Sequence, residues 1–135
     1  MSAPLLSLVM IRTAQPEVTL AFYRAIGCEF AEEKHGDGPV HHSCEMGGIV
    51  FEIYPGENGA AVNRRQAGAT MLSFTVPSLN PILLRLTEAG AEILAPAKQT
   101  AWGLRAIVAD PDGRAVNIAE STEPASHVSS EKSAG

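Results

Sequence analysis

The sequence is poor in cysteine, and this shortage excludes one class of protein. The 135 residues contain only Cys28 and Cys44, and neither belongs to a C-x-x-C pair. Two thiols cannot form the disulfide framework of a small secreted domain. We therefore expect both thiols to be free, as they are in a reducing cytoplasm.

Basic residues and long apolar runs are also scarce. Ten Lys and Arg residues stand against fifteen Asp and Glu residues, which gives a formal net charge of −5. Binding to nucleic acid needs a basic surface, so no nucleic-acid partner is expected. The apolar start, from Met1 to Ile11, is too short to span a bilayer and has no basic segment before it. We therefore expect no membrane partner and a cytoplasmic location.

The rest of the composition is that of an ordinary globular domain, with 45% apolar and 19% charged residues. A chain of this length can bury a sizeable core. We expect one domain over residues 1–122. Residues 123–135 are rich in Ser, Ala, Glu and Lys without periodicity, which predicts a disordered tail.

Signals for strands and helices occur in the same order in both halves of the chain. The first half is expected to contain a strand, a helix and three strands, at 5–11, 16–26, 28–34, 40–46 and 49–54. The second half is expected to repeat this order, at 69–76, 79–89, 91–95, 104–109 and 115–120. Glycines close both helices, Gly47-Gly48 predicts a hairpin, and Ser78 is expected to cap the second helix.

The two halves align as a duplicated module. Gly27 and Gly90 are 63 positions apart, and Phe51-Glu52-Ile53 corresponds to Val116-Asn117-Ile118 at an offset of 65. Module one is expected at 5–55, the connection at 56–68 and module two at 69–122. Three successive strands after each helix exclude a doubly wound sheet and predict an α+β fold of two tandem β-α-β-β-β modules.

Three strings resemble the vicinal-oxygen-chelate superfamily, which contains glyoxalases, bleomycin-resistance proteins and extradiol dioxygenases. Phe22 to Gly27 resembles the end of that family's first helix, and Phe51 to Tyr54 the last strand of its first module. Asp110-Pro111-Asp112-Gly113 resembles the turn before its last strand. The resemblance extends over about residues 5–120 and implies curved mixed sheets around a cleft, in a protein that is commonly a homodimer.

The resemblance also implies four inward positions that hold a divalent metal in metal-dependent members. These positions carry Leu8 and Met71 in the opening strands, and Glu52 and Asn117 in the closing strands. Only Glu52 is a good ligand, and a shift of the first strand by one residue offers only Ser7. We therefore expect neither a metal at these positions nor another cofactor, although a metal elsewhere is an open alternative.

Proton transfer is a second chemistry that the residues allow. His41 and His42 lie on opposite faces of one predicted strand, and Glu52 lies on the next strand across the hairpin. Whichever histidine faces the cleft could form an acid/base pair with Glu52. The alternatives are a rim or solvent position for the histidines, and an ion pair or amide contact for Glu52, for example with Asn117. Cys44 is expected to be a buried structural thiol rather than a nucleophile.

Two functions follow from these residues. The first is a small-molecule binder without the standard metal, in which Arg105 presents a cation and the remaining ligand-binding residues are Leu8, Tyr54, Met71, Trp102 and Asn117. The second is a glyoxalase-like lyase, an isomerase or a dioxygenase-like enzyme that acts on a small oxygenated substrate through Glu52 and His41 or His42. A third, weaker alternative is an accessory dimer with a vestigial cleft. The residues do not name the ligand.

Overall fold

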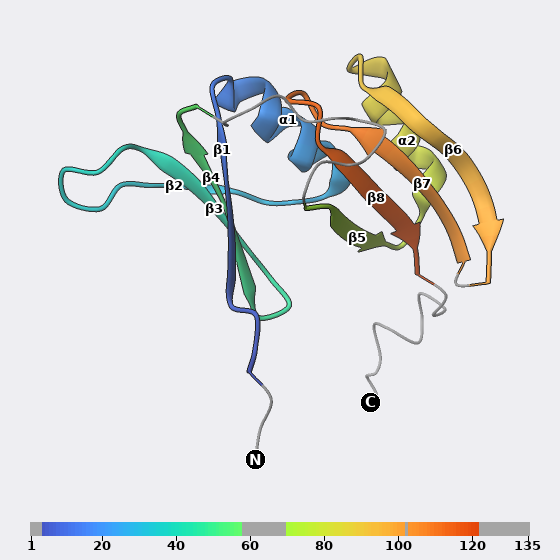
Figure 1. The fold of residues 1–135 in the computed structure, drawn as a ribbon, viewed down its shortest axis with the longest axis horizontal. Helices are drawn as coiled ribbons and strands as arrows, with labels where there is room; N and C mark the ends of the chain where they lie inside the picture. Colours follow the sequence, from blue (N-terminus) through green and yellow to red (C-terminus); the bar gives the residue numbers. More distant parts are fainter. Residues whose placement is uncertain (1–3, 58–69, 102, 122–135) are drawn as a thin grey trace. The chain divides into compact units, whose positions relative to one another are not determined.

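The structure, a computed structural model, describes residues 4–57, 70–101 and 103–121. The chain divides into two compact units, Met1–Ala61 and Val62–Gly135, and the division falls within the connection expected at 56–68. Each unit contains one four-stranded sheet and one helix (Figure 1). The expected α+β fold of two β-α-β-β-β modules is therefore confirmed. Trp102, the expected tail at 123–135 and residues 58–68 of the connection lie outside the described residues.

The first unit is a mixed sheet with the strand order β1-β4-β3-β2. Its elements, in chain order, are β1 (Leu8–Thr13), α1 (Pro16–Ile26), β2 (Ala31–Glu33), β3 (His41–Met46) and β4 (Ile49–Pro55). β1 pairs with β4 in parallel, and the other pairs are antiparallel. Gly47 and Gly48 have φ angles of 54° and 85°, so the expected tight hairpin between β3 and β4 is present.

The second unit repeats this topology with the order β5-β8-β7-β6. Its elements are β5 (Leu72–Val76), α2 (Leu79–Glu88), β6 (Glu92–Thr100), β7 (Gly103–Ala109) and β8 (Ala115–Glu120). β5 pairs with β8 in parallel, as β1 pairs with β4. In both halves of the sequence, a helix follows the first strand, and this first strand pairs in parallel with the last one.

Each helix buries one apolar stripe against its own unit. In α1 the buried stripe includes Leu20, Tyr23 and Ile26, and the Tyr23 ring meets Phe51 of β4 edge to face at 5.1 Å. Gly27 ends this helix at a φ of 126°, and its backbone N–H donates to the carbonyls of Tyr23 and Arg24. Each such fully buried side chain contributes roughly 1.5 to 3 kcal/mol.

The core of the second unit has the same construction. Leu79, Ile82 and Leu86 of α2 are buried, as are Val116 and Ile118 of β8. In both units the residues on one face of the sheet are therefore covered by the helix. The alternate residues form the other face, which we call the open face of that unit.

Several predicted strand boundaries are wrong. β1 begins at Leu8 rather than at residue 5, and β2 is limited to Ala31–Glu33, where it ends opposite His41, the first residue of β3. β6 continues to Thr100, five residues past the predicted end at Ala95. Pro96 does not stop it because β6 is an edge strand with register shifts on both sides of Ala95, where a missing N–H costs no ladder hydrogen bond.

The expected capping role of Ser78 is also wrong. Ser78 occupies the N-cap position of α2, but its side chain makes no capping hydrogen bond. A carboxylate oxygen of Glu120, at the end of β8, accepts the backbone N–H of Leu79 at 2.9 Å instead. A residue 41 positions away in sequence thus satisfies this helix terminus, and a negative charge at a helix N-terminus is favourable.

Candidate functional site

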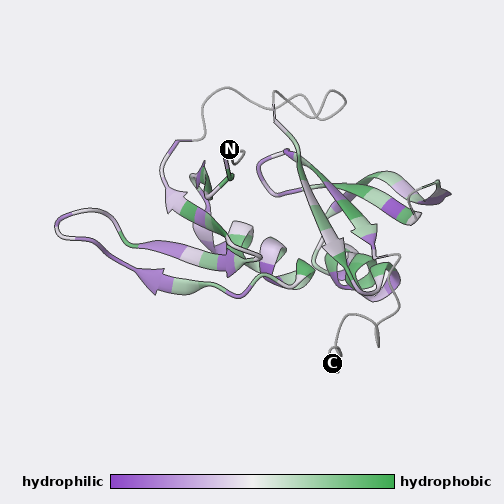
Figure 2. Cartoon of the chain, turned by 90° about the horizontal axis from the view of Figure 1, so that it is seen from below, coloured by the Kyte–Doolittle hydropathy of each residue, from purple (hydrophilic) through white to green (hydrophobic). Residues whose placement is uncertain are grey.

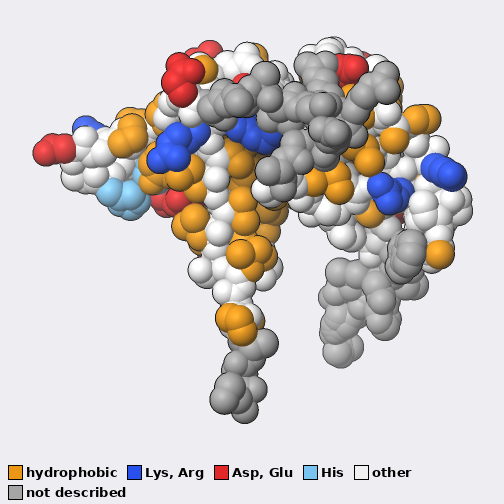
Figure 3. Space-filling model, in the orientation of Figure 1, with side chains coloured by type: hydrophobic (Ala, Val, Ile, Leu, Met, Phe, Trp, Pro, Cys, Tyr) orange, Lys and Arg blue, Asp and Glu red, His pale blue; other side chains and the backbone are white. Residues whose placement is uncertain are grey.

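The open face of the first unit carries several polar side chains. The strand register places Ser43 opposite Glu52 and Cys44 opposite Phe51, so Glu52 and Tyr54 lie on the open face. Leu8 and Met10 of β1 share that face, since Met10 is opposite Glu52. Figure 2 shows mainly hydrophilic residues along the β2–β3 hairpin. In Figure 3, histidine and acidic side chains lie at this hairpin, and hydrophobic ones gather over β1 and β4.

The structure brings His41, and not His42, to Glu52. His41 Nε2 lies 3.9 Å from Glu52 Oε2, and the side chains are 2% and 15% exposed. His42 is opposite Ile53, on the face that α1 covers, and its Nε2 lies 4.0 Å from Glu32 Oε1. Only His41 can therefore act together with Glu52.

His41 is held by contacts with neighbouring residues. Its ring stacks on Tyr54 at a centroid distance of 4.1 Å and an interplanar angle of 7°. Its Nδ1 lies 3.3 Å from the carbonyl oxygen of Pro39. Its Nε2 lies 3.3 Å from Glu33 Oε1, yet it is a buried atom without a hydrogen-bond partner among the described residues. The ring is thus fixed, with one nitrogen aimed at carboxylates.

The four positions implied by the resemblance carry two apolar side chains, one amide and one carboxylate. Leu8 and Met71 are about half exposed and apolar, at 47% and 45%. Asn117 donates from Nδ2 to Ser73 Oγ at 2.7 Å, and only Glu52 offers a carboxylate. A single carboxylate with an amide is not a set that holds a divalent ion against water.

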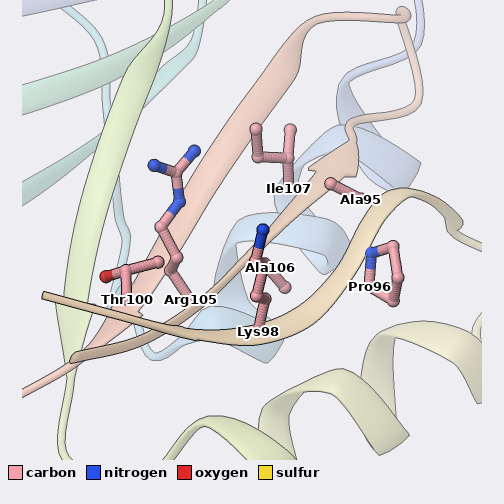
Figure 4. A pocket seen from close by; sticks show the side chains of 7 residues that line it. All are labelled: Ala95, Pro96, Lys98, Thr100, Arg105, Ala106 and Ile107. Carbon is pink, nitrogen blue, oxygen red and sulfur yellow. The ribbon is translucent and has the colours of Figure 1, made fainter.

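The second unit has a pocket on its open face. Its volume is about 360 Å³, within the range of small-molecule sites, and it is lined by Ala95, Pro96, Lys98, Thr100, Arg105, Ala106 and Ile107. Figure 4 shows Arg105 and Ile107 projecting on the same side of β7. Asn117 is opposite Ile107 and so lies beside the pocket, and its Oδ1 is buried with no hydrogen-bond partner in the described part of the chain.

Sequence reasoning missed three residues that lie around His41 or in the pocket of the second unit. Lys98 was beyond the predicted end of its strand, although it is opposite Arg105. Glu33 and His35 were not candidates. The side chain of His35 is 72% exposed, but its Nε2 lies 3.5 Å from Glu33 Oε1. The spacing of Glu33, His35 and His41 around a short turn was the available signal.

The two cysteines lie away from the open face. Cys28 and Cys44 are free and buried, with Cys44 opposite Phe51 on the helix-covered side. Burial, and to a lesser extent the neighbouring Cys44, raises the pKa of the Cys28 thiol to about 12. A thiol with this pKa is almost entirely protonated at neutral pH, so Cys28 is a poor nucleophile.

A duplicated β-α-β-β-β module with polar residues on open sheet faces defines a protein of the glyoxalase-like class. The sequence profile of the Glyoxalase/Bleomycin resistance protein/Dioxygenase superfamily matches residues 5–118, and the chain belongs to this superfamily. No curated protein sequence matches the chain. Within the described residues, no helix is long and apolar enough to cross a membrane.

Solved structures with similar folds include enzyme-related and binding proteins. A glyoxalase-related enzyme from Fulvimarina pelagi is 26% identical, with a TM-score of 0.66 over 87% of this chain and 88% of that one. TnmS3, an antibiotic binding protein from Streptomyces sp. CB03234, is 18% identical, with a TM-score of 0.64 over 90% and 99%. TioX from Micromonospora sp. ML1 is 20% identical, with a TM-score of 0.61 over 87% and 98%.

Proposed function

We propose that this protein binds a small organic molecule that carries an anionic group, without a metal at the four positions of the family. The observation that carries the proposal is the pocket of about 360 Å³ with Lys98 and Arg105 in its lining. The molecule would be held on the open face of the second unit, beside Asn117. In the same proposal, the protein binds this molecule as a homodimer in the cytoplasm.

The two cations of the pocket favour an anion. Lys98 and Arg105 are directly opposite each other on β6 and β7, an arrangement in which like charges destabilise the strand pair. No acidic side chain of the described residues lies within ion-pair distance of either one. A carboxylate or phosphate between them would offset the repulsion, and the guanidinium of Arg105 suits bidentate contact.

The rest of the lining suits the apolar part of such a molecule. Ala95, Pro96 and Ile107 present hydrocarbon to the pocket. TnmS3, which has a similar fold, is an antibiotic binding protein, and this likeness supports a binding role for the present chain. Leu8, Tyr54 and Met71 remain proposed contacts for the ligand.

The test is a panel of aromatic and aliphatic carboxylates, each paired with its methyl ester, measured by native mass spectrometry and thermal shift. We expect the acids to bind and the esters not to bind. Arg105→Met should raise the dissociation constant of the best acid by roughly 10- to 100-fold, since a charge-assisted hydrogen bond contributes about 1.5 to 3 kcal/mol. Lys98→Met should raise it by about tenfold.

Lys34→Met, which removes an exposed lysine of the first unit, is the matched control and should leave binding unchanged. Equal binding of acids and esters, or full affinity in Arg105→Met, would refute the anionic ligand. No binding across the whole panel would refute the pocket as a site.

One further observation favours a second function. His41 lies 3.9 Å from Glu52 in a buried setting, which is suited to proton transfer on a small oxygenated substrate. If the protein is an enzyme of this kind, the natural sequence should turn over such a substrate. Glu52→Gln should abolish this activity, and Arg105→Met should retain it. A substrate bound at the second-unit pocket without turnover would favour the binding function.

A further inference from the structure

The hairpin of β2 and β3 brings three potential ligands together in the first unit. Glu33 is directly opposite His41 in the strand register, and His35 follows Glu33 by two residues in the turn. One atom from each of these residues, an imidazole nitrogen or a carboxylate oxygen, lies within 4.8 Å of the others. The two imidazole rings have centroids 5.1 Å apart. None of the three is at a position that the family uses for its metal.

Two of the three distances between ligand atoms match those of a four-coordinate metal, and the third is within 4.8 Å. Glu33 Oε1 lies 3.3 Å from His41 Nε2 and 3.5 Å from His35 Nε2. Zinc bonds of about 2.0 to 2.1 Å in a tetrahedron place neighbouring ligand atoms about 3.3 Å apart. One ion between the three side chains therefore requires only small side-chain movements.

Both nitrogens of the His41 ring face oxygen atoms. Nδ1 lies 3.3 Å from the carbonyl oxygen of Pro39. Nε2 lies 3.3 and 3.9 Å from carboxylate oxygens of Glu33 and Glu52. A metal ion bound at Nε2 would lie among these carboxylates, and Nδ1–H would donate to Pro39, as metal-bound histidines commonly donate to a carbonyl.

The Nε2 atom of His41 is the independent sign of a missing partner. The side chain is 2% exposed, and this buried nitrogen has no hydrogen-bond partner among the residues that the structure describes. Buried polar atoms are rarely left unpaired, because the lost hydration costs free energy. The atom is directed at the carboxylate that His35 also approaches.

We propose that Glu33, His35 and His41 bind one divalent transition-metal ion of the zinc class. Imidazole nitrogens with one carboxylate suit zinc, cobalt or nickel, and do not suit magnesium or calcium. The site is accessible from solvent, since the side chains of Glu33 and His35 are 37% and 72% exposed. Three protein ligands leave a fourth coordination position for water or a ligand oxygen.

The test uses the full chain, expressed without a polyhistidine tag, treated with chelator and titrated calorimetrically with Zn²⁺ and Co²⁺. We expect one ion per chain, a Co²⁺ absorption spectrum typical of four-coordination, and a higher Tm with the metal than without it. Glu33→Gln and His35→Ala change partly exposed positions and should not affect folding. Each variant is expected to weaken metal binding at least about 100-fold. This is more than is expected for the loss of a residue that only hydrogen-bonds to a metal ligand.

The chain contains its own matched control. Glu32 and His42 are the same residue types, directly opposite each other on the same two strands, with Nε2 and Oε1 4.0 Å apart. Glu32→Gln and His42→Ala should keep full affinity. The absence of binding by either ion, unchanged affinity in Glu33→Gln and His35→Ala, or an equal loss in the control variants would each overturn the proposal. Because the Lys98–Arg105 pocket is a separate cluster, the carboxylate panel gives an independent result.

Discussion

The turn between β7 and β8 depends on one buried carboxylate, and its removal gives a quantitative test of the fold. Asp110 Oδ1 accepts the backbone N–H groups of Asp112 and Arg114 at 3.0 and 2.9 Å, and Oδ2 accepts Arg114 Nη1 at 3.0 Å. The Asp110 side chain has no exposed surface, and that of Arg114 is 16% exposed. Arg114 Nη1 also donates to Asp112 at 3.0 Å, so it keeps one carboxylate if Asp110 is lost.

Asp110→Ala should therefore destabilise the protein by about 3 kcal/mol. Removal of one partner of a buried ion pair costs about 3 to 5 kcal/mol, and the remaining contact between Arg114 and Asp112 places this case at the lower end. Two backbone donors also lose their acceptor, at about 1 kcal/mol or more each where water cannot replace it. Asp110→Asn keeps Oδ1 for these donors but replaces Oδ2, the acceptor of Arg114 Nη1, with an NH2 group, so we expect about 1 to 2 kcal/mol.

The assay is urea unfolding followed by far-UV circular dichroism, with the midpoint and the slope fitted for each variant. Asp37→Ala, a substitution in the exposed turn before β3, should stay within about 0.5 kcal/mol of the natural sequence. A loss below 1 kcal/mol for Asp110→Ala, or equal losses for Asp110→Ala and Asp110→Asn, would refute the structural role of the carboxylate.

Two further predictions concern the thiols and the second helix. Burial raises the pKa of Cys28 to about 12, so this thiol should react with iodoacetamide at pH 8 only after unfolding. Because its folded pKa lies above the unfolded value of 9.0, the stability of the protein should fall as the pH rises from 9 to 12. The loss should be up to about 1.4 kcal/mol per pH unit. Rapid alkylation of the native protein at Cys28, identified by mass spectrometry, would contradict this. Glu120→Ala should lower the free energy of unfolding by about 1 kcal/mol in the same urea assay, because Glu120 caps α2. Ser78→Ala should lower it by less than about 0.5 kcal/mol. The reverse order would show that Ser78 is the cap.

Local signals were sufficient for the order and type of the elements. The apolar spacing from Val18 to Ile26 with Gly27 behind it predicted α1, and Gly47-Gly48 predicted the β3–β4 hairpin, because these features depend on residues close in sequence. The end of β6 was not predictable in this way. Pro96 is tolerated only because β6 is an edge strand, and strand order is a property of the whole sheet.

The candidate sites show the same division. The sequence nominated His41, Glu52 and Arg105, but it did not pair Arg105 with Lys98 or His41 with Glu33. A shift of one residue in the pairing of β2 and β3 would have placed Glu32 opposite His41, and nothing local in the hairpin excludes that register.

The sequence by itself determined the duplicated module, its superfamily, and the residue types at Leu8, Glu52, Met71 and Asn117, since these follow from the order of residues along the chain. Only the tertiary structure decided that His41 rather than His42 meets Glu52. Alternation along a strand separates two faces without saying which one is covered. The choice is made by α1, which packs on the face of Phe51 and leaves His41 on the other, next to Tyr54 and two carboxylates.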